Sequence, residues 1–247
     1  MIPSFFGILP LKPSSMKITY LENYATLSEK AAQLIASEVK NNPELLFCAA
    51  TGGSPTGMYA EMSKQKSIYA KMRVMKMDEW GIIPLSHSDS CETYLKKHLL
   101  GPLEISDDRY TTFDTAPEEV DAECKRISQF TIENGPFDIC ILGLGKNGHI
   151  AFNEPGASLN PDFHKAILAD STIAHDPALS QGNEPAYGLC VGMEGIMQSK
   201  KIIFLVTGKG KQEAVKRIME RKIGTDCPAS FLWMHPNVEC LIDSSAI

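Results

Sequence analysis

The sequence lacks any long hydrophobic run and any concentration of positive charge. No apolar stretch in its 247 residues approaches the roughly 20 residues that a membrane-spanning helix requires. The net charge is −6, and no basic patch is interleaved with aromatic residues. These absences argue against a membrane or a nucleic acid as partner. A small anion remains a candidate ligand, because local backbone dipoles can bind it whatever the global charge.

Disulfide and metal-binding patterns are absent as well. The seven cysteines form no Cys-x-x-Cys pair, and four of them lie inside apolar runs, namely Cys48, Cys140, Cys190 and Cys240. Buried free thiols are typical of a reducing compartment, so we expect a cytoplasmic protein. The six histidines show none of the spacings typical of a zinc site, and we predict no metal.

What the sequence does contain is an alternation of short apolar runs and helical patterns. The predicted strands are Lys17–Leu21, Leu45–Ala50, Arg73–Met77, Phe137–Leu142, Tyr187–Val191, Ile202–Thr207 and Val238–Ile242. The predicted helices are Tyr24–Lys40, Pro55–Lys66, Ser88–Leu99, Pro117–Glu133 and Gly210–Arg221. This alternation predicts an α/β fold, a single-domain Rossmann-like three-layer sandwich with a mostly parallel, doubly wound sheet. We expect this domain to cover residues 16–247, after an N-terminal extension of residues 1–15 whose order the sequence leaves open.

Two of the predicted strand ends suit an anion. The strand at 45–50 is followed by Thr51, Gly52, Gly53 and Ser54. Glycines, hydroxyls and a helix start would together offer unpaired amides to a phosphate. The strand at 202–207 is followed by a glycine-flanked turn that contains Lys211, which could add a positive charge.

The other two strand ends carry acid–base groups. Asp78 directly follows the strand at 73–77, where burial would raise its pKa and make it a proton carrier near neutrality. The glycine-rich segment after the strand at 137–142 contains His149 and, five residues later, Glu154. A histidine titrates near neutral pH, and a nearby carboxylate can orient it.

Each of these features alone also fits a plain structural role. A tight strand-to-helix turn, a pair of solvated acids, a packed histidine or a solvated basic turn would explain them one at a time. Ligands of such sheets collect outside the carboxyl ends of the strands. Because all four features lie at such ends, together they predict one pocket for a small phosphorylated molecule.

At these residues the chain resembles the glucosamine-6-phosphate deaminase/isomerase family. The matching strings are Thr51-Gly52-Gly53-Ser54-Pro55, Met77-Asp78-Glu79 and Gly148-His149-Ile150-Ala151-Phe152-Asn153-Glu154-Pro155. Within the family the chain is more similar to the galactosamine-6-phosphate isomerase branch. Two strings suggest that branch, Gly143-Leu144-Gly145-Lys146-Asn147-Gly148-His149 and Pro228-Ala229-Ser230-Phe231-Leu232-Trp233.

The resemblance implies an activity and a set of roles. The substrate would be a small phosphorylated amino sugar, converted to a ketose phosphate and ammonia by an enediol-type proton transfer without a cofactor. The catalytic set would be Asp78 as proton shuttle, His149 as ring-opening group, Glu154 as its support, and Asn147. The substrate and phosphate contacts would be Thr51, Gly52, Gly53, Ser54, Gly143 and Lys211.

The chain departs from the family pattern at two positions. Asn147 stands where glucosamine enzymes typically have aspartate; it can orient a histidine by hydrogen bonding but carries no charge. Pro177 stands where those enzymes have a phosphate-binding arginine.

Several alternatives stay open at this point. Galactosamine 6-phosphate would give tagatose 6-phosphate, and glucosamine 6-phosphate would give fructose 6-phosphate; the two substrates differ only in configuration at C4. A 6-phosphogluconolactonase-like hydrolase and a non-catalytic sugar-phosphate-binding regulator are further alternatives. The sequence also leaves open whether the chain forms a homo-oligomer.

Overall fold

The computed structural model describes residues 16–81, 83–168 and 187–247, so the predicted extension and Pro177 lie outside the described residues. The strands are β1 (Met16–Leu21), β2 (Leu46–Ala49), β3 (Arg73–Lys76), β4 (Asp78–Trp80), β5 (Tyr110–Thr111), β6 (Ile139–Gly143), β7 (His164–Ala166), β8 (Gly188–Cys190), β9 (Ile202–Val206) and β10 (Val238–Asp243). The α-helices are α1 (Tyr24–Asn41), α2 (Gly53–Ser63), α3 (Cys91–Leu95), α4 (Val120–Asn134), α7 (Met193–Met197) and α8 (Gln212–Met219). Short helical turns of other types cover η1 (Lys66–Tyr69), η2 (Lys96–Leu100), η3 (Asp107–Arg109), η4 (Pro228–Met234) and η5 (Ser244–Ala246).

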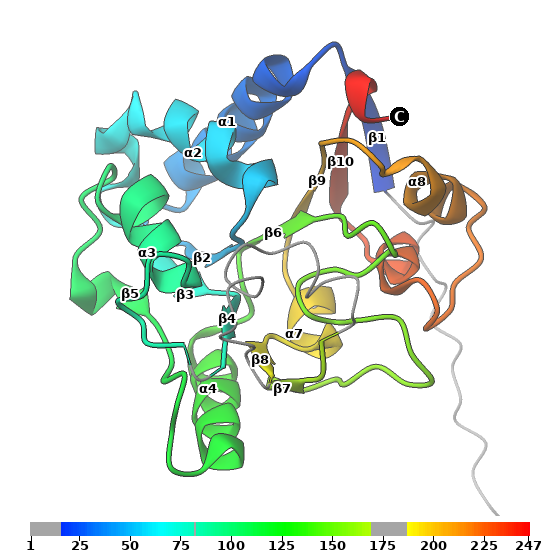
Figure 1. The fold of residues 1–247 in the computed structure, drawn as a ribbon. Helices are drawn as coiled ribbons and strands as arrows, with labels where there is room; N and C mark the ends of the chain where they lie inside the picture. The colour runs from blue at the N-terminus through cyan, green and yellow to red at the C-terminus, as the bar shows by residue number, and fades with distance from the viewer. Residues whose placement is uncertain (1–15, 82, 169–186) are drawn as a thin grey trace, which may run out of the picture.

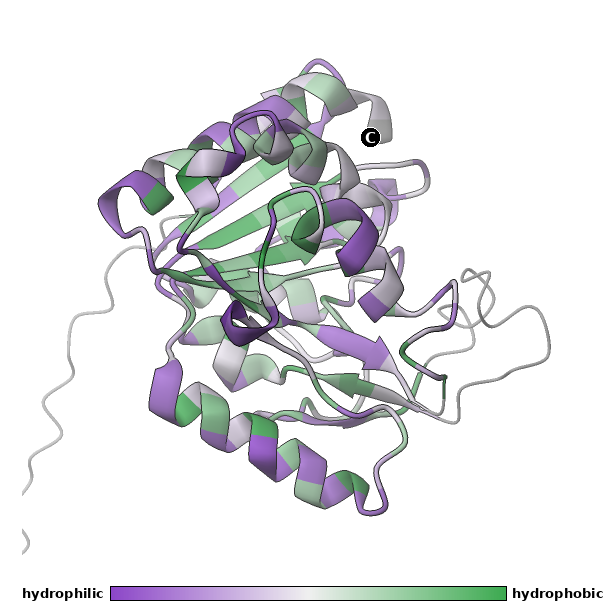
Figure 2. Ribbon diagram, turned by 90° about the vertical axis from the view of Figure 1, so that its left-hand side faces the viewer, coloured by the Kyte–Doolittle hydropathy of each residue, from purple (hydrophilic) through white to green (hydrophobic). Residues whose placement is uncertain are grey.

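A seven-stranded sheet with the order β1-β10-β9-β6-β2-β3-β5 forms the centre of the molecule, and its paired strands run parallel (Figure 1). Every residue of β2 and β9 is buried, as expected for strands that are covered on both faces. Helices α1 and α2 lie on one side of this sheet and α4 on the other (Figure 2). The predicted three-layer α/β architecture is therefore confirmed.

The order of the strands decides where the site lies. Strands β9, β6, β2 and β3 are consecutive neighbours in the sheet. They are the four strands whose ends carry the sequence features described above. Because the strands are parallel, their carboxyl ends meet at the same edge, and the four segments converge there.

A second, three-stranded sheet with the order β4-β8-β7 is antiparallel, and the sequence pattern does not predict it. The predicted strand Tyr187–Val191 exists as β8, but its assignment to the parallel sheet is wrong. After β3 the chain passes through Met77 and continues into this small sheet, where Asp78 pairs with Cys190. A short apolar run indicates that a strand is buried, but it does not indicate which sheet the strand joins.

Two predicted helix starts also need correction. The Ser54-Pro55 pair predicts a helix from Pro55, but α2 begins at Gly53 with Gly52 as its N-cap. The acidic first turn after Pro117 predicts a helix from that residue, yet α4 begins at Val120. None of the helices in the described ranges is long and apolar enough to cross a membrane.

Candidate active site

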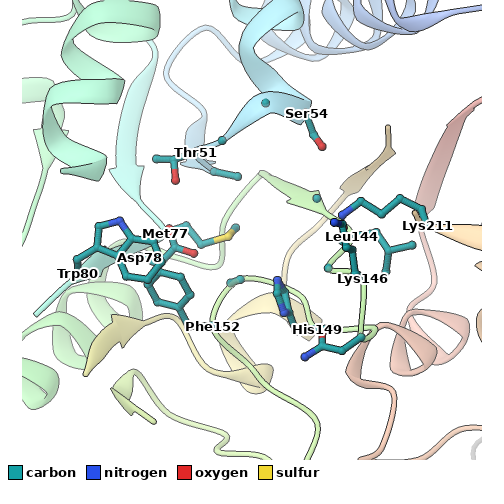
Figure 3. Close-up of a pocket in the computed structure, with 17 residues that line it drawn as sticks. Thr51, Ser54, Met77, Asp78, Trp80, Leu144, Lys146, His149, Phe152 and Lys211 are labelled. Atoms are coloured by element: carbon teal, nitrogen blue, oxygen red, sulfur yellow. Dashed lines mark hydrogen bonds between the residues drawn. The ribbon is translucent and has the colours of Figure 1, made fainter. Parts of the chain in front are cut away.

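A cavity of about 540 Å³ opens at the carboxyl ends of the four neighbouring strands (Figure 3). Its lining comprises Ala50, Thr51, Gly52, Gly53, Ser54, Met77, Asp78, Trp80, Gly143, Leu144, Gly145, Lys146, Asn147, His149, Ala151, Phe152 and Lys211. Every residue that the sequence predicted for the site lines this cavity except Glu154. Glu154 lies behind His149, with its Oε2 atom 3.3 Å from the histidine Nδ1.

One end of the cavity offers open backbone. A Cβ atom built on Gly52 or Gly53 would meet nothing within 4 Å. Gly52 also has φ +91°, a left-handed conformation that glycine adopts at little cost. The Ser54 hydroxyl lies 2.8 Å from that of Thr207, which joins the turn after β2 to the end of β9. This end can admit an anion close to the main chain.

Two lysines lie at the same end. Lys211 donates to the Leu144 carbonyl, and its half-buried side chain lines the cavity. Burial lowers the pKa of Lys211, and the neighbouring positive charge of Lys146 lowers it further. The Nζ atom of Lys146 lies 3.9 Å from where a Cβ atom on Gly210 would stand, so Lys146 reaches from the loop after β6 to the turn after β9 that contains Lys211. Two cations whose charges act on each other favour a doubly charged anion.

The opposite end holds a carboxyl group with altered acidity. Asp78 is 6% exposed, and its Oδ1 atom has no hydrogen-bond partner among the described residues. Burial raises the pKa of Asp78 to about 7; the nearby Glu79 carboxylate adds to this rise and Lys76 opposes it. Asp78 therefore meets the first requirement of a proton carrier near neutral pH.

Two aromatic side chains line the cavity on the side of Asp78 (Figure 3). The rings of Trp80 and Phe152 stack with their centroids 4.4 Å apart, and both line the cavity. A Cβ atom on Gly188 would come within 2.5 Å of the Phe152 ring, so glycine in β8 leaves room for this stack. The two rings lie beside Asp78 and give this side of the cavity an apolar wall (Figure 3).

His149 lies across the cavity from Asp78 and is held by the loop that follows β6 (Figure 3). Its ring lies over Gly145, where a Cβ atom would approach the ring to 2.4 Å. Asn147 connects the histidine to its carboxylate: the Asn147 Oδ1 accepts from the His149 backbone N–H at 3.1 Å, and its Nδ2 donates to Glu154 at 2.8 Å. Asn147 thus orients the carboxylate that faces the imidazole.

The same loop is tied to the small sheet. Asn153 is 2% exposed and donates to the carbonyls of Ile150 and Val191. The backbone N–H of Phe152 points to the Cys190 sulfur at 3.2 Å. Because Cys190 also pairs with Asp78, strand β8 supports both the carboxyl side and the histidine side of the cavity.

A buried ion cluster beneath Asp78 is a feature that the sequence reasoning missed. Lys76 and Glu79 are both 0% exposed, and Lys76 Nζ lies 2.9 Å from Glu79 and 3.1 Å from Glu92. Glu79 also accepts the backbone N–H groups of Trp80, Cys91 and Glu92, which fixes the start of α3. The available signal was Lys76 between two methionines, directly before the acidic pair Asp78-Glu79.

The geometry of this cluster predicts a strong effect on folding. Lys76→Met would leave the buried Glu79 carboxylate without a cation, and we expect the free energy of unfolding to fall by about 3–5 kcal/mol. Urea denaturation followed by circular dichroism measures it. Lys17→Met is the control, since Lys17 is exposed in its pair with Glu239 and should change stability by less than about 1 kcal/mol. Equal, small effects of both variants would contradict a structural role for the cluster.

The described residues contain no group of three or more His, Cys, Asp or Glu side chains placed to hold a metal ion. The groups that the cavity does present are an acid–base pair, backbone amides and two ammonium groups. These groups suit proton transfer on a phosphorylated substrate.

Comparison with known proteins identifies the family of the chain. The model of the family described as glucosamine-6-phosphate isomerases/6-phosphogluconolactonase matches residues 22–241. The Escherichia coli (strain K12) protein named "Putative deaminase AgaI" is 36% identical over 229 residues, covering 91% of this chain and 90% of the relative. A glucosamine-6-phosphate deaminase of Clostridium perfringens (strain 13 / Type A) is 34% identical over 239 residues, covering 94% and 98%.

Solved structures show the same relationship. A monomeric glucosamine-6-phosphate deaminase superposes with a TM-score of 0.87 at 31% identity, covering 93% of this chain and 98% of its own. A 6-phosphogluconolactonase from Trypanosoma brucei superposes with a TM-score of 0.74 at 22% identity, covering 93% and 96%, and shares the fold. The chain belongs to the glucosamine-6-phosphate isomerase/6-phosphogluconolactonase family.

Proposed function

We propose that the protein is an amino-sugar-phosphate deaminase/isomerase that converts galactosamine 6-phosphate to tagatose 6-phosphate and ammonia. The observation that carries the proposal is a single cavity that presents a carboxyl group with a pKa of about 7 and, across from it, a histidine, together with two lysines and open glycines. The preference for galactosamine rests on the strings at 143–149 and 228–233 that resemble that branch. The named relatives support deamination.

The chemistry would begin with ring opening. His149, supported by Glu154, would move a proton between O1 and the ring oxygen of the pyranose. The carboxylate of Asp78 would then take the proton from C2 of the open-chain aldehyde while O1 gains a proton from solvent, which gives an enolamine. Asp78 would return its proton to C1, so one group serves as base and then as acid.

Ammonia would leave in the last step. After protonation at C1, the C2–N bond is that of an iminium; water attacks C2, the C2–N bond breaks to release ammonia, and one proton returns to solvent, which leaves the ketose. The phosphate lies far from C1 and C2 and takes no part in bond changes. Its binding at the Thr51–Ser54 turn and the lysines would supply the energy that orients the sugar.

Ammonia release from galactosamine 6-phosphate and glucosamine 6-phosphate by the purified protein tests the proposal. We expect both to be turned over, with the higher kcat/KM for galactosamine 6-phosphate. A preference for glucosamine 6-phosphate would overturn the choice of sugar only. Inactivity on both, together with hydrolysis of 6-phosphogluconolactone, would replace the proposal by the hydrolase alternative.

The two lysines give a further prediction. Lys211→Met and Lys146→Met should each raise KM about 10- to 100-fold, because each removes a charge-assisted contact to the phosphate. We expect kcat to change less, since the phosphate is remote from the reacting carbons. Steady-state kinetics on the preferred sugar phosphate measures both constants.

Lys209→Met is the matched control for these variants. Lys209 lies in the same turn as Lys211, but it is exposed and does not line the cavity. Its replacement should leave KM unchanged. If Lys209→Met raised KM as much as the other two variants, the effect would come from long-range charge and not from a phosphate contact.

A further inference from the structure

Three tyrosine hydroxyls converge on the turn that follows β2. Tyr94 donates to the Gly52 carbonyl at 2.7 Å, and Tyr24 donates to the Gly53 carbonyl at 2.7 Å. Tyr59 donates to the Ala50 carbonyl at the same distance. The three phenols come from α3, α1 and α2, so separate parts of the chain hold consecutive stretches of one short turn.

These contacts fix the direction of the peptide groups. In a planar trans peptide the N–H of the following residue points opposite to the C=O. The N–H groups of Gly53 and Ser54 therefore point away from the phenols that hold the carbonyls of Gly52 and Gly53. Both N–H groups belong to the first turn of α2, where amides have no partner within the helix.

Tyr24 makes two hydrogen bonds to the main chain of α2. Its oxygen donates to Gly53 and also accepts the backbone N–H of Gly57 at 2.7 Å, so it joins the two groups that close the first turn of α2. A Cβ atom on Gly57 would lie 3.0 Å from the Tyr24 ring and 2.4 Å from Ser28 Oγ. Glycine at position 57 thus permits this close approach of α1.

The hydroxyl of Thr56 lies beside that of Tyr94 at the same carbonyl. The Thr56 hydroxyl lies 2.8 Å from the Tyr94 oxygen and also donates to the Gly52 carbonyl at 3.0 Å. Burial raises the pKa of Tyr94 well above its usual value, so the phenol stays protonated and remains a donor. The Gly52 carbonyl is therefore held by two hydroxyls at once.

We propose that Tyr24 and Tyr94 are positioning residues of the anion site: by holding the Gly52 and Gly53 carbonyls, they aim the Gly53 and Ser54 amides at a phosphate monoester in the cavity. This inference rests on the proposed function, since the phosphate is that of the substrate. The tyrosines touch the turn and do not line the cavity themselves. They act on binding and not on proton transfer.

Tyr24→Phe and Tyr94→Phe test the inference, because each variant removes a single oxygen atom. We expect each to raise KM for the sugar phosphate about 5- to 10-fold and to weaken binding of inorganic phosphate by the same factor. The value of kcat should stay near that of the wild type. Steady-state kinetics and isothermal titration with inorganic phosphate measure the two effects.

Tyr187→Phe is the matched control. Its hydroxyl also donates to a backbone carbonyl, that of Thr115, but outside the cavity, so KM and phosphate affinity should not change. If the wild type is active but Tyr24→Phe and Tyr94→Phe bind phosphate as tightly as it does, this inference is wrong and the proposed function stands. Variants that lower kcat and leave KM unchanged would overturn it too. A wild type that neither releases ammonia nor binds phosphate would contradict both the inference and the proposed function.

Discussion

Replacing Asp78 with asparagine should lower kcat about 10²- to 10⁴-fold, the range in which general acid–base groups contribute to catalysis. Asparagine keeps the size and polarity of the side chain but can neither take the C2 proton nor return it to C1. Ammonia release under saturating substrate measures the loss. KM should change little, because Asp78 lies at the end of the cavity away from the lysines.

The acidity of Asp78 also predicts a pH dependence. Its pKa is about 7, raised first by burial, and the form that abstracts a proton is the carboxylate. Activity of the wild type should therefore fall as the pH drops below about 7, approaching tenfold per pH unit. The residual activity of Asp78→Asn should lack this acid limb. A wild-type rate that is constant from pH 7 to pH 5 would contradict the assignment.

Folding stability separates a chemical loss from a damaged fold. A carboxyl group whose pKa is raised on folding favours the folded state least when it is ionised, so stability falls as the pH rises towards the folded value. At pH 8 the ionised, buried Asp78 should cost up to about 4 kcal/mol relative to a neutral side chain. Asp78→Asn should thus be as stable as the wild type or more stable at pH 8, with the difference vanishing towards pH 4.

His149→Gln is the second substitution with a large expected effect. Glutamine keeps hydrogen-bonding capacity but cannot carry a proton between O1 and the ring oxygen, so we expect kcat to fall about 10²- to 10⁴-fold. Phosphate binding should not change, because the imidazole is supported by Glu154 and Asn147 and not by the turn at 51–54. Kinetics together with titration of inorganic phosphate measures the two properties separately.

His164→Gln provides the comparison for this variant. His164 is also partly buried and bonds to a carbonyl, that of Asp162, but it does not line the cavity. Its replacement should leave turnover intact. Comparable losses in both histidine variants would mean that the activity responds to general disturbance of the loops and not to His149.

Much of the fold could be predicted because a short, largely apolar run in the sequence indicates a buried strand. The runs at 202–207 and 238–242 are largely apolar, as strands covered on both faces must be, and both occur in the parallel sheet. The three-residue strands β4 and β7 gave no such signal. They contain charged or polar residues and are defined by pairing with β8, a long-range contact that periodicity cannot reveal.

The site was predictable where chemistry is local in sequence. His149, Asn147 and Glu154 lie in one loop, and the structure places them in contact. The sequence did not reveal that Asn147 donates to Glu154, a role that an aspartate could not fill because its carboxylate only accepts. It also could not reveal the tyrosines, whose hydroxyls reach the turn at 51–54 from up to 42 residues away along the chain.

The passage of the chain from one sheet to the other at Met77 gives the two ends of the cavity different supports. The anion end is built on the ends of β2 and β9, and the end with Asp78 is built on β4 and β8. Changes in the small sheet would therefore act directly on the reacting end, and on the phosphate end only through α3, whose start Glu79 fixes. A family whose description joins isomerases with a lactonase is what such a division would allow evolution to produce.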